Sequence, residues 1–278
     1  MGNEWALVFF TAFVGLGSGT FVAVGVSEWW EEDAQVRLRG GILALIALAA
    51  GGFSSVLHLG HPERIFGALG HPTSGIFMEA LMIGLTGLCA VAYLIALRRG
   101  ASGQVRKRIA VIGAVPAILL AFAVGDTYVM ASRPAWDTLL LPMVYLISAA
   151  LLGCLSLGVL MARQQKAEAV VALKWTTLGV LALQGVVVIA YLVAVAVAPY
   201  PNATRSVIRV LTGNLAPLFW GGVVLVGLLV PSSLTIAKRA AAPLPVAAAT
   251  FALVCAFVGA ASFRLLMFNL GTSVWHFF

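Results

Sequence analysis

Residues 5–26 read WALVFFTAFVGLGSGTFVAVGV, an apolar run without a single charged side chain. About 20 consecutive apolar residues are enough for an α-helix to cross the hydrocarbon core of a bilayer. The run lacks the basic segment and the small-residue cleavage site of a secretory signal peptide. We therefore interpret it as a first membrane-spanning helix.

The rest of the chain has the same character. Of its 278 residues, 62% are hydrophobic and only 10% are charged, whereas a soluble domain carries about 25% charged residues. Eight apolar runs are long enough to span a membrane: 5–26, 40–59, 75–97, 109–131, 138–162, 174–198, 216–237 and 245–268. We predict an all-α integral membrane protein, with residues 1–278 forming a single eight-helix transmembrane domain.

The distribution of basic residues predicts the orientation. The net charge of +7 does not indicate nucleic-acid binding, because the basic residues lie in short loops between apolar runs, as membrane topology requires. Twelve follow the first, third, fifth and seventh runs and four follow the second, fourth and sixth, namely Arg64, Arg133, Arg205 and Arg209. Basic loops stay in the cytoplasm, so both termini are expected on the outer side.

Cysteine and histidine positions argue against a resident metal or haem. Each cysteine lies alone in an apolar run, without the spacing of a zinc or iron–sulfur site; they are Cys89, Cys154 and Cys255. Among the histidines only His58 lies on a predicted span, so the facing pair that haem b needs is missing. We predict that this chain holds no metal, haem or iron–sulfur cluster.

One stretch gathers polar side chains in this apolar chain. Residues 58–79 read HLGHPERIFGALGHPTSGIFME and contain three of the four histidines. His58 ends the second span and Glu79 lies about one turn into the third; an ionisable group in a span is a functional candidate by default.

The connection between these two residues is expected to fold back over the bundle. Pro62 favours the start of a short interfacial helix over 62–69, which would bring Arg64 near both His58 and Glu79. Thr73 or Ser74 can cap the third span.

Other polar residues occupy the outer parts of the spans. Asp126, with Tyr128 just beyond it, is compatible with a helix-packing hydrogen bond or with function. Asp137 is expected to reach the interface, and for Arg264 snorkelling and function both remain open. Gln184, the central polar residue, is expected to form an interhelical hydrogen bond.

The polar stretch suits a small apolar ligand with two polar ends, held near the membrane surface. A quinol has this chemistry, and its oxidation releases two protons and two electrons. A carboxylate or an imidazole beside a quinol hydroxyl can accept the proton as a general base, and an arginine can keep the carboxylate charged. Since no redox centre is evident in the chain, the electrons must pass to a partner on the outer face.

The pattern HLG-x-P-x-R-x-F-x-x-L, followed by a glutamate in the next span, resembles the membrane anchor subunit of bacterial dimethyl sulfoxide reductases, the DmsC family. The resemblance covers the whole chain. It extends to Pro134-Ala135-Trp136, Gln184-Gly185, Leu218-Phe219-Trp220 and Arg264.

The resemblance implies a complex in the bacterial cytoplasmic membrane. A molybdopterin catalytic subunit lies outermost, and a four-cluster iron–sulfur subunit connects it to an anchor that binds menaquinol without haem. The residues tied to quinol oxidation match His58, Arg64 and Glu79. The chain departs from the pattern in a loop about one residue shorter before Glu79. It also departs at 259–261, where relatives can carry an acid and this sequence has glycine and alanines.

We therefore expect this chain to be the quinol-oxidising anchor, itself non-catalytic toward the terminal acceptor. Glu79 is the predicted proton acceptor, His58 the hydrogen-bond partner of a quinol oxygen, and Arg64 the residue that orients Glu79 or the quinol. Further candidates for the quinol pocket are His61, Asp126, Tyr128 and Arg264. The alternatives are a related eight-span anchor that translocates protons and, as a third reading, a secondary transporter, although transporters place their sites near the midplane.

Overall fold

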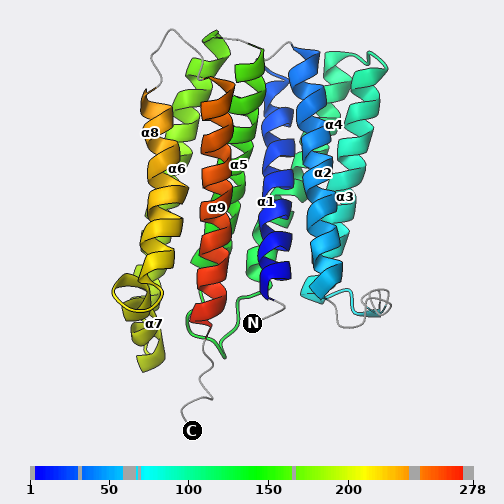
Figure 1. Cartoon of the computed structure of the whole chain (residues 1–278). Coiled ribbons are helices and arrows are strands. Elements are labelled where there is room, and N and C mark those ends of the chain that lie inside the picture. Colours follow the sequence, from blue (N-terminus) through cyan, green and yellow to red (C-terminus); the bar gives the residue numbers. More distant parts are fainter. Residues whose placement is uncertain are drawn as a thin grey trace.

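The computed structural model describes residues 4–30, 33–58, 67, 70–164, 167–237 and 245–271, with backbone alone for 4, 58 and 167–172. The described residues form long helices joined by short connections (Figure 1). The helices are α1 Glu4–Ser27, α2 Ala34–His58, α3 Gly75–Arg98, α4 Gly103–Asp126, α5 Leu140–Arg163, α6 Ala167–Ala196, α7 Pro201–Leu211, η2 Pro217–Leu229, α8 Val230–Ala237 and α9 Val246–Leu270.

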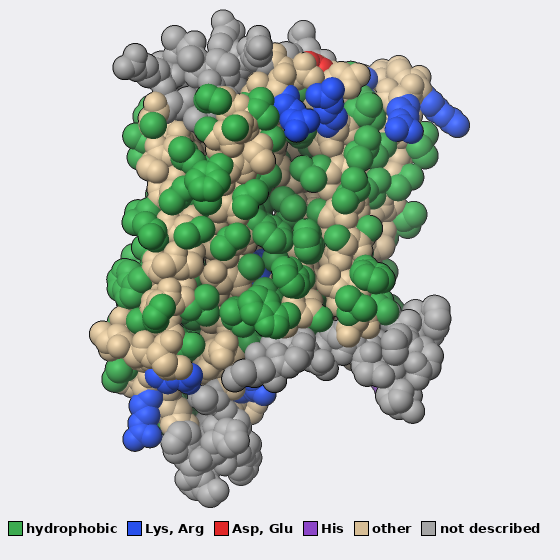
Figure 2. Space-filling model, in the orientation of Figure 1, with side chains coloured by type: hydrophobic (Ala, Val, Ile, Leu, Met, Phe, Trp, Pro, Cys, Tyr) green, Lys and Arg blue, Asp and Glu red, His purple; other side chains and the backbone are tan. Residues whose placement is uncertain are grey.

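Eight of these segments are long and apolar enough to cross a membrane, with η2 and α8 together forming one of them. The prediction of eight spans is therefore confirmed. The space-filling view shows hydrophobic side chains along the flank of the bundle and Lys and Arg at its two ends (Figure 2). Large apolar side chains such as Phe53, Leu88 and Val197 are exposed there, as expected for a surface that faces lipid.

Several helices extend beyond the predicted apolar runs. Helix α4 begins at Gly103 rather than at residue 109, because the Ser102 hydroxyl caps it by accepting a hydrogen bond from the Val105 amide at 3.4 Å. Its first turns therefore carry charged residues out of the apolar layer. At the other end α4 stops at Asp126, so Tyr128 lies in the following connection.

Helix α1 lies at the centre of the bundle, where it packs against α2, α4, α5 and α9. Its contact with α5 is close because two glycines face each other. A Cβ atom on Gly19 would overlap the Ala149 carbonyl group, and one on Gly153 would overlap the backbone of Gly19. Small residues at such positions let membrane helices approach backbone to backbone.

The start of α1 and the end of α9 lie at the same end of the bundle, at the bottom of Figure 1. We call this the terminal end and the opposite one the far end. An even number of spans requires this arrangement. The twelve Lys and Arg residues that follow the first, third, fifth and seventh apolar runs lie in or beside the connections after α1, α3, α5 and α8. These connections belong to the far end, so the expectation that the terminal end faces outward rests on that count.

Two elements differ from the sequence prediction. The predicted span 216–237 is a π-helix as far as Leu229 and an α-helix from Val230; the change lies beside Pro231, which has no N–H for the helical ladder. The connection 199–215 contains helix α7, which begins with Pro201 and buries Ala203, Ser206, Val207 and Val210. That spacing is the apolar face of an amphipathic helix.

Candidate functional site

The start of α3 positions the predicted proton acceptor. Ser74 is the N-cap, and its hydroxyl accepts a hydrogen bond from the Phe77 amide at 3.2 Å, as the sequence predicts. Glu79 therefore lies in the second turn of a span, and it is only 8% exposed. Its Oε1 atom has no hydrogen-bond partner among the described residues. A carboxylate oxygen buried without a partner is costly, which favours a functional role over a structural one.

The connection between α4 and α5 brings the Thr127 hydroxyl within hydrogen-bonding range of the Glu79 side chain and places the Tyr128 phenol nearby. Tyr128 packs edge-on against Trp136 and Phe268, with ring centroids 5.7 and 5.2 Å away, and its phenol is within electrostatic range of Glu79. Thr127 packs against Gly75 in the first turn of α3. The two elements thus meet at Glu79 although they are far apart in sequence.

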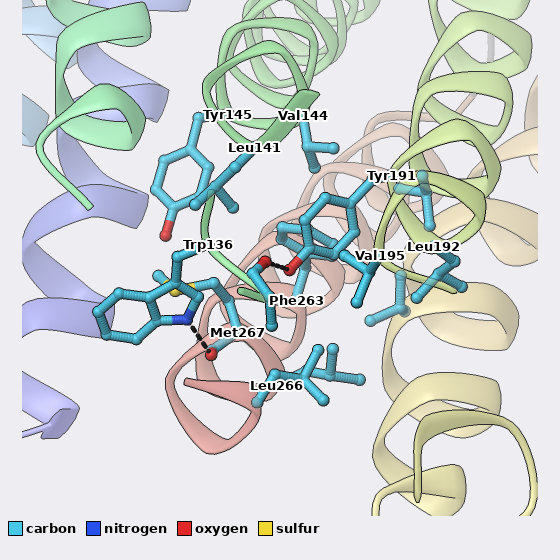
Figure 3. Packing of buried hydrophobic residues seen from close by; sticks show 14 of the residues in the cluster. Trp136, Leu141, Val144, Tyr145, Tyr191, Leu192, Val195, Phe263, Leu266 and Met267 are labelled. Atoms are coloured by element: carbon cyan, nitrogen blue, oxygen red, sulfur yellow. Dashed lines mark hydrogen bonds between the residues drawn. The ribbon is translucent and has the colours of Figure 1, made fainter. Parts of the chain in front are cut away.

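The connection is fixed by hydrogen bonds into the bundle (Figure 3). The indole nitrogen of Trp136 donates to the Met267 carbonyl at 2.8 Å, and the Tyr191 hydroxyl donates to the Ala135 carbonyl at 2.7 Å. Burial raises the pKa of the Tyr128 phenol above its usual value, and the nearby Tyr145 and Glu79 raise it further. Tyr128 is therefore protonated at neutral pH and can donate a hydrogen bond to a ligand oxygen.

Arg264, on α9, is the most deeply buried charged residue of the described chain, with 1% of its surface exposed. It does not snorkel. Its Nη1 donates to the Ala260 carbonyl at 2.9 Å, its Nη2 lies 3.3 Å from the Thr11 carbonyl and 3.4 Å from the Ser148 hydroxyl, and its guanidinium stacks on Tyr145 at 4.4 Å. No carboxylate forms an ion pair with it among the residues that the structure describes.

We define the terminal-end cluster as Glu79, Tyr128, Tyr145 and Arg264. The Tyr145 phenol is within electrostatic range of Glu79 and Arg264, and its oxygen has no hydrogen-bond partner among the described residues. The cluster thus combines a buried acid, a buried cation and two phenols with unused hydrogen-bonding capacity. Such a set can bind and deprotonate a ligand that carries hydroxyl groups.

The remaining predicted residues are only partly brought to this cluster. His58 ends α2, but its side chain, like the whole of His61 and Arg64 and the predicted helix 62–69, lies outside the described residues. Asp126 and Asp137 are exposed at the terminal end. The contact of His58 and Arg64 with Glu79 therefore stays a prediction.

Gln184 is buried, and its Oε1 atom has no hydrogen-bond partner among the described residues. The predicted interhelical hydrogen bond is therefore not seen for this atom. With Ser148 and Arg264, Gln184 lines a void of about 20 Å³ between α5, α6, α9 and η2. A void of this size holds about one water molecule, which can bridge Gln184 and Arg264.

A second buried charge cluster lies at the far end and was missed by sequence reasoning. Glu28, 6% exposed, accepts hydrogen bonds from the Tyr93 hydroxyl at 2.7 Å, from Arg106 Nε at 3.1 Å and from Arg37 Nη1 at 3.4 Å. We call these four residues the far-end cluster. Both carboxylate oxygens are used. In the sequence Glu28 is one of four acids within 28–33, and no local pattern distinguishes it from the others.

Comparison with known proteins identifies a family. The family model described as polysulphide reductase, NrfD, matches residues 3–272, which is nearly the whole chain. No curated protein matches the sequence. In the part of the chain that the structure describes, no group of three or more His, Cys, Asp or Glu side chains lies close enough to hold a metal ion.

Proposed function

The chain belongs to the polysulphide reductase NrfD family of membrane subunits, which anchor molybdoenzyme complexes and interact with quinols, and on this premise we propose that it oxidises menaquinol at its terminal end. The observation that carries the proposal is the buried Glu79 carboxyl group, which has an unpartnered oxygen and lies within electrostatic range of the Tyr128 phenol. A general base has to lie within reach of the proton that it removes.

In the proposed reaction menaquinol loses two electrons and two protons and becomes the quinone. As the first quinol O–H bond breaks, the Glu79 carboxylate accepts the proton and becomes a carboxylic acid. Tyr128 donates a hydrogen bond to a quinol oxygen, and His58 is the second hydrogen-bonding partner. The proton of the second hydroxyl leaves to water at the outer face, and both electrons pass to an iron–sulfur subunit docked there.

We propose that this partner carries four clusters and delivers electrons to a molybdopterin subunit of the dimethyl sulfoxide reductase type, in the bacterial cytoplasmic membrane. The family supports the class of partner, and the resemblance of residues 58–79 supports the specific type. The basic count at the far end supports docking at the terminal end. In this arrangement Arg64 holds Glu79 or the quinol in place.

The test is Glu79→Gln in the purified complex. Amide nitrogen and oxygen replace the carboxylate at nearly the same volume, so folding is retained while the base is lost, and quinol-dependent reduction of the terminal acceptor should fall by about 10²–10⁴-fold. Activity near that of the wild type contradicts the assignment.

Two controls accompany the test. Asp137→Asn removes an exposed carboxylate at the same end and should leave quinol oxidation within about twofold, since a surface charge is largely screened. Reduction of the acceptor by an artificial donor that feeds the catalytic subunit directly should be unchanged in both variants.

Proton translocation is the second candidate, and the void shared by Gln184, Ser148 and Arg264 favours it. The void places the polar side chains of Ser148 and Gln184 beside Arg264 of the terminal-end cluster, between otherwise apolar walls. Translocation requires protons to appear outside in excess of those released by the quinol. Measurement of the proton-to-electron ratio in vesicles decides between the two functions.

A further inference from the structure

The far-end cluster borders a polar cavity of about 360 Å³. Its walls come from the turn after α1 and from the starts of α2 and α4, and they comprise Glu28, Trp29, Trp30, Arg37, Gly103, Arg106 and Lys107. Three cations and one carboxylate leave a surplus of two positive charges on the described lining. The Lys107 ammonium lies over the Trp29 ring, 5.5 Å from its centroid.

A second cavity, of about 390 Å³, shares the lining residue Trp30 with the first and is almost wholly apolar. Residues of α1, α4, α5 and α6 line it, among them Val26, Ala121, Leu146, Ala150 and Val180. It lies in the middle of the bundle, where α5 contributes positions from Leu146 to Leu157, and it extends to the far end, where α1 and the turn after it contribute positions up to Trp30. Helices α4 and α6 both pack against α5 and form its side walls.

Trp30 lines both cavities. The two cavities are therefore neighbours at Trp30, and together they make up the candidate site, with a cationic part at the far end of the bundle and an apolar part that extends to its middle. Tryptophan is favoured at such a boundary because its indole ring is largely apolar while its N–H group can donate a hydrogen bond to water or to a headgroup. The volume of each part is within the range of about 300–1,000 Å³ that is typical of small-molecule sites.

We propose that this site binds one anionic phospholipid of the leaflet at the far end, with its phosphate in the polar cavity and an acyl chain in the apolar cavity. Basic pockets between transmembrane helices on the cytoplasmic side recognise anionic headgroups, and the far end carries the basic loops. The Glu28 carboxylate holds Arg37 and Arg106 in place, while Lys107 faces the headgroup. The site lies at the opposite end from Glu79 and does not depend on the proposed quinol chemistry.

The experiment uses the full chain, purified in mild detergent, stripped of lipid and examined by native mass spectrometry. Phosphatidylglycerol, phosphatidylcholine with the same acyl chains, and inorganic phosphate are added separately. The wild type should retain one phosphatidylglycerol, bound at least about fivefold more tightly than phosphatidylcholine, since one basic residue near the surface contributes about this factor. Equal retention of the two lipids overturns the proposal.

Two variants locate the site, and each has a matched control. Lys107→Gln should weaken phosphatidylglycerol binding about fivefold, whereas Arg108→Gln, an exposed neighbour outside the cavity lining, should not. Ala150→Phe fills the apolar cavity and should weaken binding of the lipid, whereas Ala92→Phe, on the exposed face of α3, should not.

If a variant and its control change phosphatidylglycerol binding equally in either pair, the assignment of the site is wrong. If inorganic phosphate binds as tightly as phosphatidylglycerol and Ala150→Phe has no effect, the cavity is a free-anion site and the lipid assignment is wrong.

Discussion

The two ends of the bundle differ in how many partners they provide for a buried carboxyl group. At the far end Glu28 receives three hydrogen-bonding partners, two of them cations. At the terminal end Glu79 has an oxygen without a partner, and Arg264, buried in the same region, has no carboxylate among the described residues. A buried charge that is fully paired serves the fold, whereas one left unpaired is retained for function.

The largest expected effect on stability concerns the paired acid. Glu28→Gln leaves Arg37 and Arg106 without their carboxylate, and removal of one partner from a buried ion pair costs about 3–5 kcal/mol. The midpoint of thermal unfolding in detergent should fall clearly. Quinol oxidation per folded molecule should be unchanged, because the cluster is at the other end of the bundle. A variant as stable as the wild type would show that the far-end network is not structural.

Arg264→Met tests the opposite half of the comparison. Replacing a buried charge by an apolar side chain of similar length is often neutral or stabilising, and the carbonyl groups that Arg264 contacts belong to helices. The free energy of unfolding should therefore stay within about 1 kcal/mol of that of the wild type, while the rate of quinol oxidation falls. A loss of stability as large as that of Glu28→Gln would assign Arg264 to the fold instead.

Tyr128→Phe separates binding from packing. The ring contacts with Trp136 and Phe268 remain, so stability should change little. Loss of a hydrogen bond to a quinol oxygen should lower kcat/KM about tenfold, equivalent to roughly 1.4 kcal/mol. Because burial raises the pKa of this phenol, Tyr128 stays protonated and the ratio of wild type to variant should be constant between about pH 6 and 8.

Tyr191→Phe is the matched control for this variant. Its hydroxyl donates to the Ala135 carbonyl, so its removal should cost about 1 kcal/mol of stability and leave kcat/KM close to that of the wild type. The same kinetic loss in both variants would mean that the connection between α4 and α5, rather than the Tyr128 hydroxyl, matters.

The sequence predicts the spans well because each is an uninterrupted apolar run, which needs no tertiary information. Helix α7 is too short and polar for that criterion, although Pro201 and the spacing of its buried residues indicate it. Glu79 and Arg264 stand out because ionisable residues are rare in apolar runs. Their approach to Tyr128 and Tyr145 depends on how α3, α5 and α9 pack, and the burial of Glu28 depends on the meeting of four helix ends, which no local pattern encodes.

The smallest effect distinguishes a functional arginine from a merely buried one. A Cβ atom on Gly15 would lie 3.2 Å from Arg264 Nη2, so Gly15→Ala should displace the guanidinium by a few tenths of an ångström. Gly52→Ala is the matched control, because its added methyl group meets nothing within 4 Å. In both variants alanine reduces the conformational freedom of the unfolded chain, which should stabilise the fold by about 0.5–1 kcal/mol. If Arg264 positions the quinol site, the rate of quinol oxidation should fall about twofold in Gly15→Ala and stay unchanged in Gly52→Ala. The expected loss is small because the displacement would lengthen one hydrogen bond without breaking it. Equal rates of quinol oxidation in the two variants would assign Arg264 a packing role only. The functional residues of the terminal-end cluster would then be Glu79, Tyr128 and Tyr145.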